Sequence, residues 1–232
     1  MLQNNKNVFL GVLSGDKPVA SLAAIKNLHS NSENPLNVLR KLDLGDNIEW
    51  VKGRYWNNET DNFFNDCMIN KKSLFEIIKN NKEIYTKRLD LSKTSSTKKI
   101  YNSLISYSIN NNGLPNDLLG ITLGFPKYDS MIFHIDNMYN LNNMRQSTEY
   151  VDNLLKTFEK EDFPYKNIDK KTLNNLIKSI KNINQENFKN IRTNGSYDDG
   201  LYQFINFCKD QKELERISRA TKHFMKMFNP LP

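Results

Sequence analysis

The stretch DKKTLNNLIKSIKNI, residues 169–183, decides the fold class of this chain. Its apolar side chains recur at the spacing of one helix face: Leu173, Leu176, Ile177, Ile180 and Ile183. Asp169 stands just before them, where an aspartate side chain can accept hydrogen bonds from the first backbone N–H groups of a helix. The pattern therefore predicts an amphipathic helix that begins after Asp169 and buries one apolar face.

Helical periodicity recurs along most of the chain, whereas the period-two alternation of strands is rare. Ser73 and Glu76 have the spacing of a capping box at a helix start. We predict helices over 19–28, after Asn34-Pro35, over 73–85, over 100–109, on both sides of Gly124-Phe125-Pro126, and over 151–158, 201–208 and 214–228. Only residues 47–56, and less clearly 8–13, favour extended structure. The predicted fold is mainly α: a multi-helix, bundle-like globular domain with at most a small β-hairpin near 47–56.

A run of asparagines that ends in glycine, Asn110-Asn111-Asn112-Gly113, favours the end of a helix and the start of a new part of the chain. We therefore predict an N-terminal helical subdomain over 1–112, with the small hairpin, and a C-terminal helical subdomain over 113–232. One continuous domain is the alternative, because 232 residues suit either arrangement.

The chain is basic, with a formal net charge of +7 and a pI of about 9.2. Such a balance is found in proteins that bind nucleic acid or membrane surfaces. However, 35 Asn against 4 Ala, and 26 Lys against 7 Arg, is the composition that A/T-rich codons produce. We expect an AT-rich genome, and part of the charge then reflects base composition. The basic residues are also spread along the chain, so nucleic-acid binding through a diffuse basic surface is kept as an alternative.

The cysteine content and the length of the apolar stretches indicate the cellular compartment. Two cysteines, Cys67 and Cys208, are too few for a disulfide framework, which favours a reducing compartment. No apolar stretch approaches the roughly 18 residues of a membrane span, and the run 8–13 is too short for a signal peptide. We expect a soluble, cytoplasmic protein without a transmembrane segment, and export without an apolar signal stays open. Its oligomeric state stays open too.

The candidate catalytic residues are two nucleophiles, Cys67 and Ser130, and one base, His134. Ser130 precedes His134 by one helical turn, and Cys67 is the second residue that this histidine could activate. The opposing interpretation is structural: Cys67 falls beside Phe64 and Met68 on an apolar face if its segment is helical, and Cys208 falls on a similar face. A Cys- or Ser-dependent hydrolase or transferase is therefore the alternative function.

No metal or cofactor is expected. The sequence has no His-Glu-x-x-His, no paired Cys-x-x-Cys and no acidic calcium loop. It also lacks the glycine-rich loops that bind phosphates in nucleotide sites.

Two segments are candidate binding surfaces. One mixes aromatic and basic residues, a combination that anchors interfaces and stacks on bases: Trp50, Lys52, Arg54, Tyr55 and Trp56. The other is a basic stripe on the last predicted helix: Arg216, Arg219, His223 and Lys226. Since the common catalytic signatures are missing, the sequence favours a helical interaction protein that acts on a partner protein, or on a host protein if it is delivered into another cell.

Overall fold

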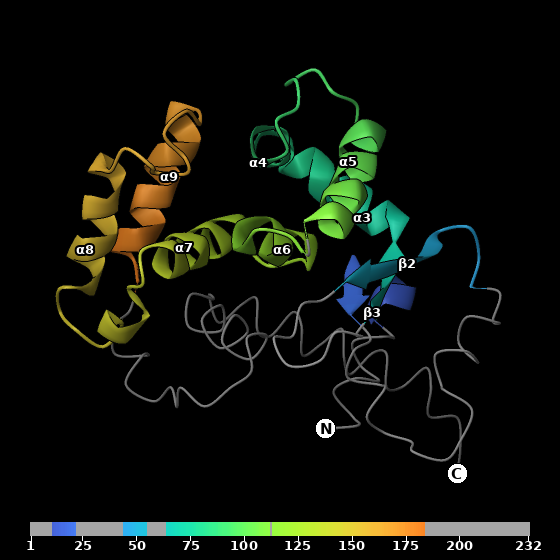
Figure 1. The fold of residues 1–232 in the computed structure, drawn as a ribbon, viewed down its shortest axis with the longest axis horizontal. Helices are drawn as coiled ribbons and strands as arrows, with labels where there is room; N and C mark the ends of the chain where they lie inside the picture. The colour runs from blue at the N-terminus through green and yellow to red at the C-terminus, as the bar shows by residue number, and fades with distance from the viewer. Residues whose placement is uncertain (1–10, 22–43, 55–63, 112, 184–232) are drawn as a thin grey trace, which may run out of the picture. The chain divides into compact units, whose positions relative to one another are not determined.

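The structure is a computed structural model that describes residues 11–21, 44–54, 64–111 and 113–183 (Figure 1). It is mainly α-helical, as the helical periodicity predicts. The described residues fall into two compact units. The first contains those up to Leu114 together with Thr122–Gly124, and the second contains Pro115–Ile121 and residues 125–183. The predicted division into 1–112 and 113–232 stays a prediction.

The first unit contains a three-stranded antiparallel sheet with the order β1-β3-β2. Its strands are β1 Val19–Ser21, β2 Ile48–Arg54 and β3 Phe64–Asn70. The strand predicted within 47–56 is confirmed over the seven residues of β2. Trp50 lies opposite Met68 in the register, and it packs with Ile48 against a small core made by Met68 and Val12.

Three predictions about the sheet and the residues before it are wrong. Val19–Ser21 is a strand and not the start of a helix. Residues 11–14 are helical, whereas extended structure was expected over 8–13. The segment around Cys67 is the central strand β3 and not a helix. Both faces of β3 are covered, because the adjacent residues Met68 and Ile69 are both buried. A strand buried on both faces shows no alternation of apolar and polar residues, so its sequence does not distinguish it from a helix.

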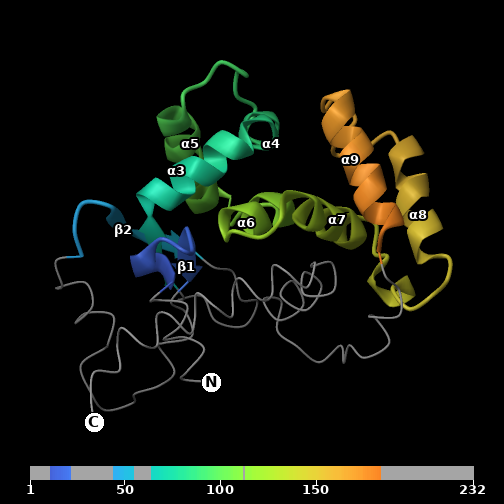
Figure 2. The same ribbon diagram turned by 180° about the vertical axis from the view of Figure 1, so that it is seen from behind.

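Three longer helices are described after the sheet in the first unit: α3 Lys71–Asn80, α4 Lys82–Arg88 and α5 Thr97–Asn110 (Figures 1 and 2). The single helix expected over 73–85 is thus two helices that meet at Asn81. The predicted capping box at Ser73 is wrong, since Asn70 is the N-cap and accepts a hydrogen bond from the Ser73 N–H at 3.1 Å. The Ser73 hydroxyl instead donates to the Gly15 carbonyl at 2.8 Å, which ties α3 to the loop before β1.

The described part of the second unit is helical. The elements described there are α6 Asn116–Thr122, whose last residue is assigned to the first unit, α7 Lys127–Met138, η2 Asn142–Met144, α8 Tyr150–Lys156, η3 Thr157–Glu159 and α9 Lys170–Lys181. The predicted start of α9 is confirmed, because the Asp169 side chain accepts from the Thr172 N–H at 2.9 Å. The predicted turn between two helices is confirmed as well: Gly124 has φ of 89° and α7 begins after Pro126. Leu176 and Ile180 of α9 are fully buried.

The helices predicted after Asn34-Pro35, over 201–208 and over 214–228 lie outside the described residues. In the parts of the chain that the structure describes, no helix combines the length and the apolar character needed to cross a membrane.

Candidate functional site

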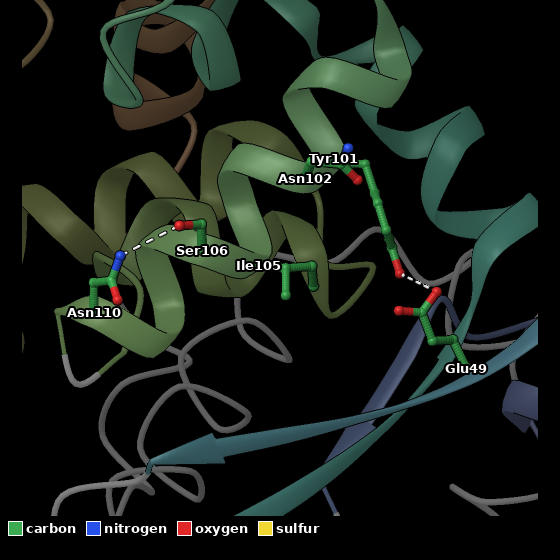
Figure 3. Close-up of a pocket in the computed structure, with 6 residues that line it drawn as sticks. All are labelled: Glu49, Tyr101, Asn102, Ile105, Ser106 and Asn110. Atoms are coloured by element: carbon green, nitrogen blue, oxygen red, sulfur yellow. Dashed lines mark hydrogen bonds between the residues drawn. The ribbon is translucent and has the colours of Figure 1, made fainter.

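An open hollow of about 370 Å³ lies between strand β2 and helix α5 in the first unit (Figure 3). Six residues line this β2–α5 hollow: Glu49 from the strand, and Tyr101, Asn102, Ile105, Ser106 and Asn110 from the helix. Glu49 is the one charged side chain among them. The hollow thus brings Glu49, the neighbour of the predicted binding residue Trp50, together with a helix that the sequence does not connect with it.

Helix α5 buries one face and lines the hollow with residues spaced four apart along an exposed face. Ser96 caps its start by accepting from the Lys99 N–H at 3.2 Å, and Ile100 and Leu104 bury its inner face. Residues four apart follow one line along a helix. Asn102, Ser106 and Asn110 form such a line and are exposed, with Asn110 Nδ2 donating to Ser106 Oγ at 3.3 Å. The helix therefore presents a rim of amide and hydroxyl groups.

The hydrogen bond between Tyr101 and Glu49 spans the hollow at its strand side (Figure 3). Tyr101 Oη donates to Glu49 Oε2 at 2.9 Å, and the tyrosine ring packs edge-on against Phe75 with centroids 5.2 Å apart. Burial, and then the hydrogen bond and charge of Glu49, raise the pKa of Tyr101 well above its ordinary value. Tyr101 consequently stays a protonated donor, and it holds the Glu49 carboxylate in place.

The structure separates the predicted catalytic residues between the two units. Cys67 lies half-buried in β3 of the first unit, and burial raises the pKa of its thiol to about 11. Ser130 and His134 lie in α7 of the second unit. Ser130 is fully buried and its hydroxyl donates to the Pro126 carbonyl at 3.0 Å, whereas the His134 ring is edge-on to Tyr165 at 6.2 Å between centroids. The Ser130 proton is thus directed to helix backbone and not to His134.

The predicted binding residues are described only in part. Trp50 is half-buried and belongs to the packing of the sheet, and Lys52 and Arg54 follow it in β2. The remaining candidates lie outside the described residues: Tyr55, Trp56, Arg216, Arg219, His223 and Lys226.

Sequence reasoning missed a buried polar cluster in the second unit. The Asp136 side chain is 0% exposed and accepts from Arg145 Nε at 3.1 Å, from Arg145 Nη2, and from Tyr150 Oη at 2.8 Å. Burial alone would lower the pKa of Arg145, but the hydrogen bond and charge of Asp136 outweigh it and raise that pKa. These hydrogen bonds join Asp136 of α7 to Tyr150 of α8 and to Arg145 in the turn between the two helices.

A second buried carboxylate, Asp117, accepts from Tyr165 Oη at 2.8 Å in the same unit. Within the described residues, no group of three or more His, Cys, Asp or Glu side chains is arranged to hold a metal ion. Comparisons of the chain with protein-family models, with curated proteins and with solved structures find no match.

Proposed function

We propose that this chain is a binding protein that engages a partner protein through the β2–α5 hollow. The observation that carries the proposal is the half-buried Glu49 carboxylate, held by Tyr101 in a hollow whose rim consists of exposed amide and hydroxyl groups. Tyrosine is enriched at the energetic centres of protein interfaces, and a charge held in place there can pair with an opposite charge on the partner. The proposal moves the binding surface away from the predicted residue Trp50 to Glu49, which lies on the opposite face of β2.

The shape of the hollow favours a macromolecular partner. Sites for small molecules enclose most of their ligand, which requires deep and largely apolar cavities. The β2–α5 hollow is open and only half-buried Ile105 and buried Tyr101 give it an apolar floor, so a side chain of a larger partner suits it better. The surrounding surface of that partner would supply the rest of the contact area.

The chemistry of Cys67 and Ser130 favours binding over the hydrolase alternative. A nucleophilic cysteine needs a lowered pKa, whereas burial raises that of Cys67. A nucleophilic serine needs access to substrate, whereas Ser130 is fully buried. Nucleic-acid binding gains nothing from the hollow, because its one charged side chain, Glu49, would repel a phosphate.

Selection of peptides from a random displayed library against the whole protein tests the proposal. We expect selected peptides to bind the native chain and to lose at least tenfold in affinity on Ser106→Trp, which fills the hollow from its exposed rim. Lys79→Trp is the matched control, because it adds the same ring at an exposed position of α3 outside the hollow. It should change affinity less than twofold. If no selected peptide depends on Ser106, the proposal is wrong.

A further inference from the structure

We infer that the partner segment is an extended peptide that pairs with the outer edge of β2 and places a lysine or arginine side chain on Glu49. This inference rests on the proposed function and adds the conformation and the charge of the partner.

The edge of the sheet is the first ground. In the order β1-β3-β2, β2 is an outer strand, and within the described residues β3 is its one hydrogen-bonded neighbour. In an antiparallel pair, alternate residues of such a strand direct their N–H and C=O groups away from the sheet. With seven residues and no proline, β2 is long and regular enough to receive an added strand.

The position of the hollow along that edge is the second ground. Glu49 lies opposite Ile69, on the opposite face of the sheet from Trp50 and Met68, and Figure 3 shows its side chain extending from β2 to Tyr101 of α5. A strand added to β2 would run roughly 4.8 Å from it, with every second side chain on the α5 side. Those side chains would meet the exposed rim of α5, so the edge and the hollow form one continuous surface.

The charge of the hollow is the third ground. Glu49 accepts one hydrogen bond from Tyr101 through Oε2, and it has no cationic partner within the described residues. A half-buried carboxylate is stabilised by a cation that donates to its remaining lone pairs. Asn102 and Asn110 each add an amide oxygen at the rim, and these suit the several N–H donors of an arginine or lysine.

The test measures the selected, hollow-dependent peptides against variants of the whole protein. We expect those peptides to contain a lysine or arginine, to bind about tenfold more weakly to Glu49→Gln, and to lose binding when alternate backbone nitrogens are methylated. Glutamine keeps an acceptor for Tyr101, so the fold is retained. As a control, Glu76→Gln removes a negative charge at an exposed position of α3 outside the hollow. It should change peptide affinity less than twofold.

Any of the following results would overturn the inference, and each shows whether the proposed function fails with it. Hollow-dependent peptides that tolerate both Glu49→Gln and backbone methylation would keep the proposed function and exclude a cationic strand. Peptides that bind as helices, shown by circular dichroism of the complex, would do the same. A concentration-dependent dimer that Ser106→Trp dissociates would identify a second copy of the chain as the occupant. The absence of any hollow-dependent binder would remove both proposals together.

Discussion

At the residue scale, the close approach of Gly120 and Ser130 shows that this serine, a candidate nucleophile by sequence, takes part in tight helix packing. A Cβ atom on Gly120 would lie 2.5 Å from Ser130 Oγ and 2.9 Å from its Cβ. We predict that Gly120→Ala destabilises the protein by about 1–3 kcal/mol because of this overlap. On an open helix face the same substitution stabilises by about 1 kcal/mol, so the sign of the change, measured by urea unfolding, is diagnostic.

A double-mutant cycle with Ser130→Gly provides the control. Removing the serine side chain makes room for the new methyl group, so Gly120→Ala should cost less in that background than in the native chain. Equal costs in both backgrounds would show that the strain arises elsewhere.

Cys67 provides a second prediction at this scale. Burial raises the pKa of its thiol from 9.0 to about 11, so at pH 8 the reactive thiolate is about a hundredfold scarcer than in the unfolded chain. In a Cys208→Ser variant, which isolates Cys67, we expect alkylation by iodoacetamide to be about a hundredfold slower than in the urea-unfolded protein. The rate should rise with pH up to about 11. Native and unfolded rates that agree at pH 8 would restore the thiol hydrolase hypothesis.

At the scale of elements, Asp136 holds α7 against α8 through Arg145 and Tyr150. We predict that Asp136→Asn destabilises the protein by about 3 kcal/mol, because it leaves a largely buried guanidinium, 17% exposed, without its counter-charge. Denaturant unfolding measures the change. Glu161→Gln removes an exposed carboxylate from the same unit and should change stability by less than about 0.5 kcal/mol. Equal losses of stability in the two variants would mean that the change in net charge, and not the loss of the buried ion pair, causes the effect.

The elements also show which parts of the fold are predictable from sequence. Helix α9 is predictable because one of its faces is buried and the other is exposed to solvent, and because Asp169 marks its start. Strand β3 is not, because Met68 and Ile69 are both buried and the period-two signal vanishes. The start of α3 differs from the predicted capping box because Asn70, and not Ser73, is the N-cap. The Ser73 hydroxyl donates to the Gly15 carbonyl, 58 residues away, and no local sequence pattern indicates such a long-range partner.

At the scale of the whole molecule, the candidate site also depends on contacts between residues that are distant in the sequence. Glu49 and Tyr101 are 52 residues apart, and neither has a neighbouring motif that marks it. The sequence predicts extended structure within residues 47–56 and a candidate binding surface there. It does not identify α5 as the helix beside that segment, because tertiary packing decides which helix meets the strand. Periodicity records which face of an element is buried, whereas a site depends on which two elements meet.

The last prediction concerns the two units, each of which has its own buried core. Leu74 and Ile78 are fully buried in the first, and Leu154 and Leu176 in the second. Because cooperative unfolding follows contiguous cores, we expect hydrogen exchange to localise the effect of a core substitution. Asp136→Asn should lower amide protection in α7, α8 and α9 and leave α3 and α5 unchanged, whereas Leu74→Ala should do the reverse. Loss of protection throughout both units with either variant would show that the chain unfolds as one cooperative body.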